Sequence, residues 1–210
     1  MTSHDATIFL VDDDEAVRKA ISRLLNSAGY QVETFPSAQN FLDSAHFNKK
    51  PSCLLLDVQM PGLSGLDLQQ QLHQTRAPLA IVFLTGHGDI PMSVRAIKGG
   101  AVDFLTKPVH DADLLQAVEA ALLRAAADHA AQAELDAIRQ LAATLTPRER
   151  EVMALVVAGR LNKQIAGELG TVEKTVKVHR ARVMEKMRVK SLAELVRLVQ
   201  KLAESERREL

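Results

Sequence analysis

Apolar runs and amphipathic stretches alternate along the first half of the chain. The runs Thr7–Val11 and Ala80–Thr85 are nearly continuous in hydrophobic residues, which is typical of strands buried on both faces. Between such runs, apolar residues recur at helical spacing. This alternation predicts an α/β unit with a doubly wound, five-stranded parallel sheet. The predicted strands are 7–11, 31–35, 54–57, 80–85 and 102–106, and the predicted helices are 17–28, 38–47 with Ser37 as its cap, 66–72 and 92–98.

A long stretch without helix-breaking residues follows this region. Residues 109–146 contain no Gly or Pro, and residues 117–143 include 12 Ala, which favours one long helix or two nearly collinear ones. Leu115, Val118 and Leu122 begin a heptad, but polar residues then fall on its seam. We therefore expect a connecting helix with a short self-association stretch, not a long coiled coil.

The last third of the chain has the punctuation of short helices. Thr146 to Glu149 forms a capping box with Pro147 at the first helical position, and Ser191 to Glu194 forms a second box. Glycines at 159 and 170 end two helices in between. Four short helices with a glycine-marked turn between the middle two predict an all-α helix-turn-helix unit.

Charge divides along the same lines. Among the 210 residues, 26 Lys and Arg balance 26 Asp and Glu. Residues 1–122 nevertheless carry a net charge of −5, residues 123–145 a net charge of −1, and residues 146–210 a net charge of +6. We predict a first domain over 1–122, a helical linker over 123–145 and a second domain over 146–210. A neutral total thus conceals an acidic domain joined to a basic one.

Several protein classes are excluded at this stage. Cys53 is the only cysteine and lies in an apolar run, which excludes an intramolecular disulfide and a cysteine-based zinc site. No apolar run approaches the ~20 residues of a membrane span. The N-terminus has no basic segment followed by an apolar one, so we expect a cytoplasmic protein without a membrane partner.

Three carboxylates occur at the ends of predicted strands. Asp12 and Asp13 follow the first strand, and Asp57 ends the third. In a sheet of order 2-1-3-4-5 these strands are neighbours, and ligands bind at their carboxyl ends. Clustered carboxylates favour a hard divalent cation with oxygen ligands, Mg²⁺ or Mn²⁺. Lys107 and Thr85 follow the same pattern at the ends of the fifth and fourth strands.

The motifs around these residues resemble those of bacterial two-component receiver domains over about residues 5–125. They are Val11–Asp14, Leu56–Gly62, Leu84–Gly86 and Leu105–Pro108. The resemblance implies that a sensor histidine kinase phosphorylates Asp57, and that Lys107 and Pro108 are joined by a cis bond. It also implies a metal site made by Asp12, Asp13, Asp57 and the carbonyl of Gln59, phosphoryl contacts from Thr85 and Lys107, and a switching aromatic at Phe104.

The helix-turn-helix region is strongly basic. Residues 162–190 hold eight Lys and Arg against three Glu. On the predicted helix 173–187 and the residue before it, apolar side chains form one stripe and basic ones the opposite face, which is typical of a helix that enters the major groove. The stripe is Val172, Val176, Val183 and Met187, and the opposite face is Lys174, Lys177, Val178, Ala181 and Arg182.

This region resembles LuxR-type DNA-binding domains over about residues 142–205. The motifs are Leu145–Val152, Asn162–Ala166 and Glu173–Arg180. With the receiver, the chain resembles response regulators of the FixJ/NarL class, and the stretch Gly88–Met92 favours the FixJ branch. The resemblance implies a dimer surface on the last helix, base contacts from Lys177, Val178 and Ala181, and phosphate contacts from Asn162, Lys163, Lys174, Thr175 and Arg182.

Together these patterns predict a response regulator that controls transcription. On phosphorylation it would dimerise through a receiver face that includes Arg95, Lys98 and Asp103, bind double-stranded promoter DNA and engage RNA polymerase, with the resemblance favouring an activator. It would slowly dephosphorylate itself but would not be a turnover enzyme. One alternative is a Mg²⁺-dependent phosphatase, which would need an acid where Gln59 stands. Another is a receiver whose helical tail binds protein.

Overall fold

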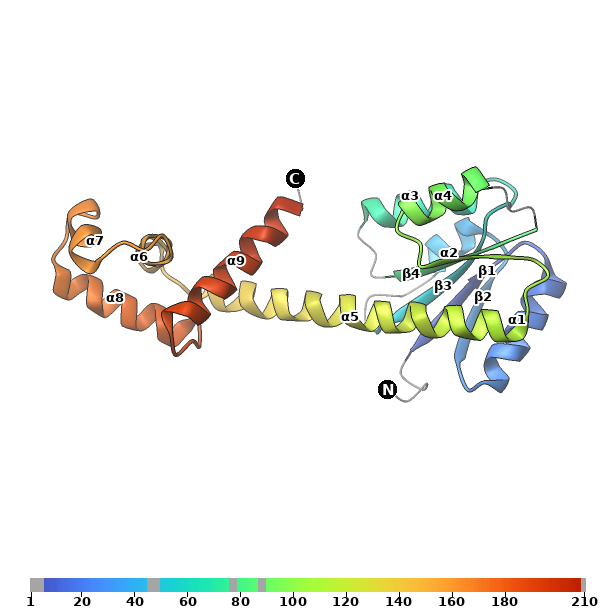
Figure 1. The fold of residues 1–210 in the computed structure, drawn as a ribbon, viewed down its shortest axis with the longest axis horizontal. Helices are drawn as coiled ribbons and strands as arrows, with labels where there is room; N and C mark the ends of the chain where they lie inside the picture. Colours follow the sequence, from blue (N-terminus) through green and yellow to red (C-terminus); the bar gives the residue numbers. More distant parts are fainter. Residues whose placement is uncertain (1–5, 45–49, 76–78, 87–89, 209–210) are drawn as a thin grey trace. The chain divides into compact units, whose positions relative to one another are not determined.

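The computed structural model describes residues 6–44, 50–75, 79–86 and 90–208. By contact density the chain divides into two compact units, residues 1–130 and residues 131–210, and each is described by itself (Figure 1). The domain boundaries at 122 and 145 stay predictions.

The first unit is built on one parallel sheet. Its strand order is β2-β1-β3-β4-β5, and all four neighbouring pairs are parallel, as the sequence predicts. Three strand starts differ from the prediction by one or two residues. The strands are β1 (Thr7–Val11), β2 (Gln31–Phe35), β3 (Ser52–Asp57), β4 (Leu79–Thr85) and β5 (Asp103–Thr106).

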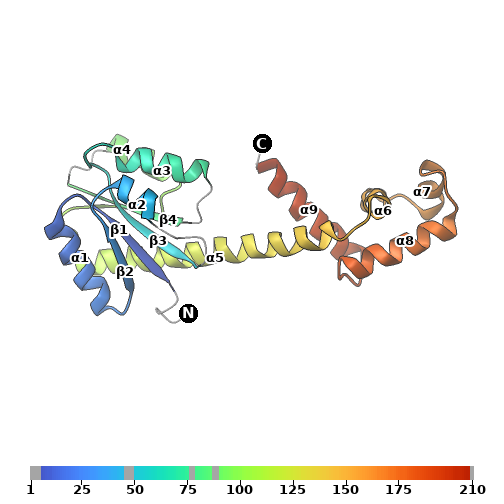
Figure 2. The same cartoon turned by 180° about the vertical axis from the view of Figure 1, so that it is seen from behind.

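Helices cover both faces of this sheet (Figures 1 and 2). Two hydrophobic cores result: one contains residues of α2, α3 and α4, and the other contains residues of α1 and α5. The predicted second helix ends at Ser44, and the residues up to Phe47 lie outside the described part of the chain. The helices are α1 (Glu15–Ser27), α2 (Ala38–Ser44), α3 (Gly65–Gln74), α4 (Ile90–Lys98) and α5 (Asp111–Ala143).

The alternation of side chains along each strand fills the two cores. In β1, Phe9 and Val11 face the first core, whereas Ile8 and Leu10 face the second. Both sets are buried, which explains why the strands are apolar throughout. Cys53 lies in the second core, and burial raises the pKa of its thiol to about 12, so it behaves as a small apolar residue.

The helix α5 is a single continuous helix. Its first part packs on the sheet, where Val118 is fully buried, and near its end Ile138 is buried in the core of the second unit. Leu115 and Leu122 pack beside Val118 in the core of the first unit. These three residues therefore begin a heptad pattern because they face the chain's own sheet, and a self-association stretch on α5 stays a prediction.

The second unit contains four helices after the end of α5. The first, α6, begins with the predicted capping box, in which Thr146 Oγ1 accepts from the Glu149 N–H and Glu149 Oε2 accepts from the Thr146 N–H. The core of this unit contains the buried side chains of Val176, Val183 and Met187. These helices are α6 (Pro147–Val157), α7 (Asn162–Glu168), α8 (Glu173–Lys186) and α9 (Leu192–Arg208).

Two local predictions for this unit are wrong. Val172 is 64% exposed, because it is the extended residue before α8 and so does not follow the helical phase of the apolar stripe. At Ser191 only half of the capping box forms: Ser191 Oγ accepts from the Glu194 N–H, but the Glu194 carboxylate accepts from the N–H of Lys190. Among the described residues, no helix combines the length and hydropathy needed to cross a bilayer.

Candidate functional sites

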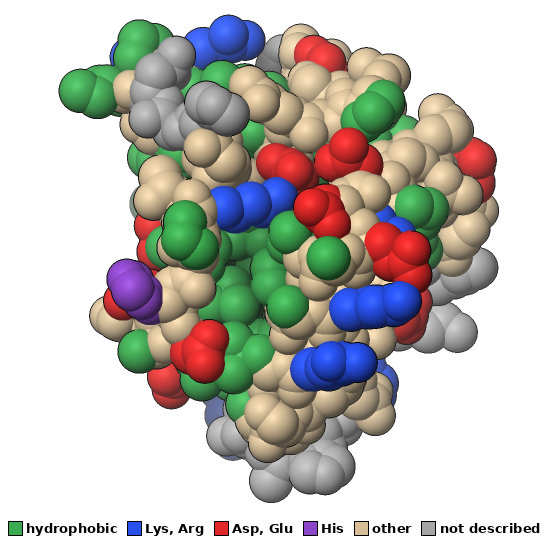
Figure 3. Space-filling view, turned by 90° about the vertical axis from the view of Figure 1, so that its right-hand side faces the viewer, with side chains coloured by type: hydrophobic (Ala, Val, Ile, Leu, Met, Phe, Trp, Pro, Cys, Tyr) green, Lys and Arg blue, Asp and Glu red, His purple; other side chains and the backbone are tan. Residues whose placement is uncertain are grey.

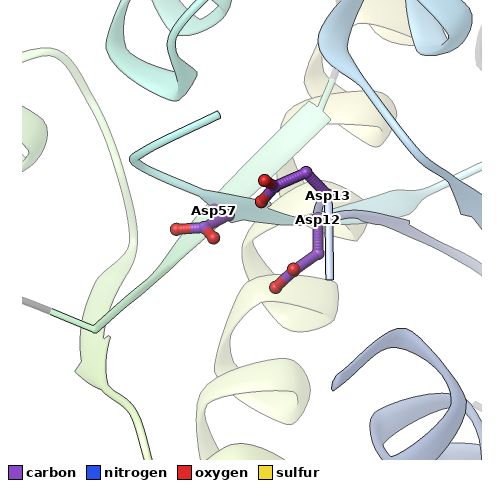
Figure 4. A group of neighbouring side chains, drawn as sticks. All are labelled: Asp12, Asp13 and Asp57. Atoms are coloured by element: carbon purple, nitrogen blue, oxygen red, sulfur yellow. The ribbon is translucent and has the colours of Figure 1, made fainter. Parts of the chain in front are cut away.

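The parallel topology brings three carboxylates together. Asp12 and Asp13 follow the end of β1, and Asp57 is the last residue of the neighbouring strand β3. One carboxylate oxygen from each lies within 4.8 Å of the others, and Figure 4 shows the three side chains around a common space. Asp12 and Asp57 are buried, whereas Asp13 is exposed. Three oxygen ligands in this arrangement suit a hard divalent cation.

A lysine that follows the edge strand β5 contacts the same carboxylates. Lys107 follows β5, and its Nζ lies 2.5 Å from Asp12 Oδ2 and 2.7 Å from Asp57 Oδ2. It therefore neutralises part of the charge that the carboxylates accumulate. The Lys107 N–H donates to the carbonyl of Thr85 at 2.6 Å, and this hydrogen bond holds the backbone of Lys107 beside the end of β4. The bond between Lys107 and Pro108 is cis, as the resemblance implies.

Two opposing effects set the pKa values of Asp12 and Lys107, namely burial of each group and hydrogen bonding to the opposite charge. Burial raises the pKa of Asp12, and the hydrogen bond from Lys107 only partly opposes this effect. For Lys107 burial alone would lower the pKa, but hydrogen bonds to Asp12 and Asp57 together outweigh it and raise the pKa. The lysine is thus held protonated between the two carboxylates.

The loop after β3 fixes the position of Asp57. The Gln59 N–H donates to Asp57 Oδ1 at 3.2 Å, and the Gly65 N–H donates to the Val58 carbonyl at 3.0 Å. A Cβ at Gly65 would lie only 2.2 Å from the carbonyl oxygen of Asp57. The start of α3 can therefore approach the site this closely only because residue 65 is glycine. Sequence reasoning missed this requirement, although Gly65 lies only three residues past the motif that ends at Gly62.

The two residues that are expected to respond to a phosphoryl group, Thr85 and Phe104, lie on β4 and β5. Thr85 ends β4 and is fully buried. Phe104 on β5 is half-buried, with its ring centroid 6.3 Å from that of Phe83. The residues predicted for a receiver contact lie next to this strand: Arg95 and Lys98 are exposed on α4, and Asp103 begins β5.

An apolar hollow adjoins the carboxylate cluster. It has a volume of about 220 Å³, and Lys107 forms part of its wall beside apolar residues of α1 and of the segment that leads into α5. Figure 3 shows a face on which acidic side chains gather around a basic one, next to a hollow with a hydrophobic lining. The apolar lining residues are Val17, Ala20, Ile21, Leu24, Pro108, Val109 and Leu114.

In the second unit, the predicted DNA-contacting residues lie on α7 and α8. Those of α8 that were expected to face away from the core are all exposed, and Lys163 on α7 is exposed as well. Asn162, the first residue of α7, is half-buried, as is Thr175. The exposed residues of α8 are Lys174, Lys177, Val178, Ala181 and Arg182.

Contacts that could not be predicted from the sequence pattern hold α6, α7 and α8 together. Lys186 at the end of α8 donates to Glu149 Oε2 at 2.6 Å and to the Thr144 carbonyl at 3.2 Å. Hydrogen bonds from Lys186 and from the Thr146 N–H lower the pKa of Glu149 from its usual 4.5 to about 2. Arg148 donates to the carbonyl of Leu169, which ends α7. The start of α6 therefore anchors both helices of the helix-turn-helix.

Comparison with protein families accounts for both units. The receiver domain family of response regulators matches residues 8–119, and the LuxR family of bacterial regulatory proteins matches residues 143–199. The chain belongs to the response regulators with a LuxR-type DNA-binding domain. This response regulator is a regulator of transcription, and its family implies a histidine kinase and DNA as partners.

Known members of the family resemble this response regulator over nearly its whole length. Nodulation protein W of Bradyrhizobium diazoefficiens is 49% identical over 95% of this chain and 88% of that protein. The transcriptional regulatory protein FixJ of the same organism is 44% identical over 91% of this chain and 93% of that protein. The solved structure of response regulator StyR has a TM-score of 0.81 at 49% identity, covering 94% of this chain and 99% of that one.

Proposed function

We propose that Asp57 is the residue at which this response regulator is switched, through phosphorylation by a sensor histidine kinase. The observation that carries the proposal is the convergence of Asp57 with Asp12, Asp13 and Lys107 at one edge of the sheet. Lys107 and the Gln59 N–H orient the two oxygens of Asp57, and Lys107 and the Asp14 N–H orient those of Asp12 in the same way. Asp57 is the more accessible of the two, because its side chain is 9% exposed whereas that of Asp12 is fully buried.

In the transfer, a carboxylate oxygen of Asp57 attacks the phosphorus of the phosphohistidine. The bond between phosphorus and the imidazole nitrogen breaks, and the imidazole leaves with the bonding electron pair. Lys107 is 2.7 Å from Asp57 Oδ2, so it pairs with an oxygen of the new acyl phosphate. Thr85 then moves from its buried position toward the phosphoryl group, and Phe104 repacks beside it.

Mg²⁺ is the cation that suits the carboxylates of this site. Asp12, Asp13 and Asp57 offer hard oxygen ligands, and the carbonyl of Gln59 is the fourth ligand that we propose. When bound, the ion would neutralise charge on the equatorial phosphoryl oxygens. The chain is not a turnover enzyme in this scheme, because Asp57 is both catalyst and acceptor and is regenerated only by slow hydrolysis.

The hollow beside Lys107 is where we place the kinase. A protein that delivers a phosphoryl group to Asp57 must cover the edge of the sheet that carries Lys107, and the apolar wall next to it offers surface to bury. The partner would therefore present apolar side chains to α1 and a phosphohistidine to Asp57.

The second unit would bind DNA once the receiver is phosphorylated. Phosphorylated receivers dimerise through a face that includes Arg95, Lys98 and Asp103, and α9 adds a second dimer surface. Paired α8 helices then read promoter DNA in the cytoplasm. Lys177, Val178 and Ala181 meet base edges, whereas Asn162, Lys163, Lys174, Thr175 and Arg182 contact phosphates. RNA polymerase is the partner that we propose for activation.

The acceptor is tested with a labelled small acyl phosphate. Wild-type protein should take up one equivalent of label in Mg²⁺, and Asp57→Asn should take up none. Asp43→Asn is a matched control, because Asp43 is an exposed carboxylate on α2 and should not matter. Stoichiometric labelling of Asp57→Asn would show that the acceptor is another residue.

The division of roles on the DNA-binding face is tested by two lysine variants. Lys177→Ala should lose about 1–3 kcal/mol of discrimination between preferred and mixed duplexes. Lys163→Ala should weaken binding to both duplexes equally and reduce the salt slope of log K by ~0.9. Preferred duplexes come from selection in a random pool, with and without phosphorylation. Equal effects of the two variants on discrimination would contradict the assignment.

A further inference from the structure

Two basic residues of α8, Arg180 and Lys186, belong neither to the buried stripe nor to the exposed face, and Arg180 is the one that contacts α7. Arg180 follows Val176 by four residues and precedes Val183 by three, so it lies on the side of α8 that packs inward. It is half-buried, unlike Lys177 and Arg182, which are exposed.

The guanidinium of Arg180 reaches the first residue of α7. Its Nη1 donates a hydrogen bond to Asn162 Oδ1 at 3.3 Å. Asn162 therefore presents its oxygen to Arg180, because the amide nitrogen Nδ2 is a donor and cannot accept from a guanidinium. The same bond turns Nδ2, with its two hydrogens, away from Arg180.

We propose that Arg180 is a positioning residue, which acts on DNA by orienting the Asn162 amide so that Nδ2 donates to a backbone phosphate. This inference rests on the proposed DNA contacts of α7 and α8. It adds a residue that those contacts do not include, and it explains how a neutral side chain at the start of α7 is held in a donor orientation. Arg180 itself does not neutralise a phosphate in this arrangement.

The salt dependence of binding separates this role from a direct contact. A cation that neutralises one phosphate contributes ~0.9 to the slope of log K against log salt, whereas a hydrogen bond from a neutral amide contributes no counterion release. Arg180→Met should therefore weaken binding to any duplex about 3- to 10-fold, as expected for one hydrogen bond. Its salt slope should equal that of the wild type.

A double-mutant cycle tests whether Arg180 acts through Asn162. Full-length protein, treated with an acyl phosphate, is titrated with a mixed-sequence duplex at several salt concentrations. Arg180→Met and Asn162→Ala should weaken binding by similar factors, and the double variant should bind no worse than either single variant. Multiplication of the two effects, or a slope reduced by ~0.9 in Arg180→Met, would overturn the proposal.

Asn162→Asp supplies a second test that does not remove the arginine. Aspartate still accepts from Arg180 but has no hydrogen to donate, and its charge repels a phosphate. The expected order of affinity is wild type, then Asn162→Ala, then Asn162→Asp. Equal affinity of the two Asn162 variants would refute the contact with phosphate. A folding defect would instead lower the fraction of protein that binds, which a stoichiometric titration measures.

The proposed function is monitored in the same experiment by Lys163→Ala. If that variant keeps the wild-type slope, the assignment of α7 to the DNA face fails, and the Arg180 proposal fails with it. If Lys163→Ala loses ~0.9 in slope but the cycle shows no coupling, only the role of Arg180 is wrong.

Discussion

Gly65→Ala is expected to damage the proposed phosphorylation site without touching any of its charged groups. The new Cβ would lie 2.2 Å from the Asp57 carbonyl oxygen, 3.0 Å from its carbonyl carbon and 3.1 Å from Val58 Cα, and Cβ atoms essentially never approach within 3.0 Å. The backbone of α3 and that of β3 must therefore separate by about 0.8 Å. All three neighbours are backbone atoms, so no side chain can rotate to relieve the clash.

Two magnitudes follow from this separation. Overpacking of this kind typically costs ~1–3 kcal/mol of stability, which urea unfolding of the full chain would detect. A displacement near 1 Å at a reacting group can reduce the rate by ~10²-fold. We therefore expect Gly65→Ala to be labelled by a small acyl phosphate about 10- to 100-fold more slowly than the wild type, with a stoichiometry that still approaches one.

A glycine in the same loop provides the control. Gly62 has a φ of +81°, and a Cβ added to it would have no atom within 4 Å, so Gly62→Ala strains the backbone but pushes no atom of Asp57. It should lose ~1–2 kcal/mol and keep the wild-type labelling rate. If Gly65→Ala is as stable and as quickly labelled as the wild type, the close approach of α3 does not position Asp57.

Three other changes probe interactions described above. Lys107→Met should bind Mg²⁺ more tightly in calorimetry, because a cation leaves the carboxylates, and should be labelled ~10²-fold more slowly; weaker Mg²⁺ binding would contradict the proposed site. Thr146→Ala removes the cap of α6 and should cost about 1 kcal/mol in urea unfolding. Glu149→Gln should be less stable than the wild type at neutral pH. Since the pKa of Glu149 is about 2 in the folded protein and its usual value is 4.5, this difference should be full above pH 4.5 and shrink as the pH falls toward 2. A difference independent of pH would refute the lowered pKa.

The sheet and its carboxylate cluster were predictable because each depends on local sequence and on one topological rule. Asp12 directly follows the run that forms β1 and Asp57 ends the run that forms β3, and the strand order follows from the β–α repeats. The predicted bounds of β1 and β2 agree with the structure. The exposed basic face of α8 was also predictable, because helical spacing separates it from the buried Val176 and Val183.

What the sequence missed depends on contacts between distant residues or on where a helix starts. Lys186 meets Glu149 across 37 positions, and no periodicity relates the two. Val172 has the spacing of the apolar stripe but lies one residue before α8, so its side chain points elsewhere. In the sequence Arg180 is one of several cations in a basic region, and its hydrogen bond to Asn162 is visible only in the structure.

The two faces of the sheet differ in the size of what they bury, and this bears on how the chain avoids misfolding. The core under α2 to α4 holds the buried phenylalanines, whereas α5 presents alanines to the other core. In β1, β3 and β4 both faces are buried and largely apolar, so polarity alone would not penalise one of these strands if it slipped by one residue. Such a slip would push phenylalanine rings against alanines on one side and leave voids on the other. Fidelity of register in these strands therefore depends on volume, and the buried phenylalanines that they carry are Phe9 and Phe83.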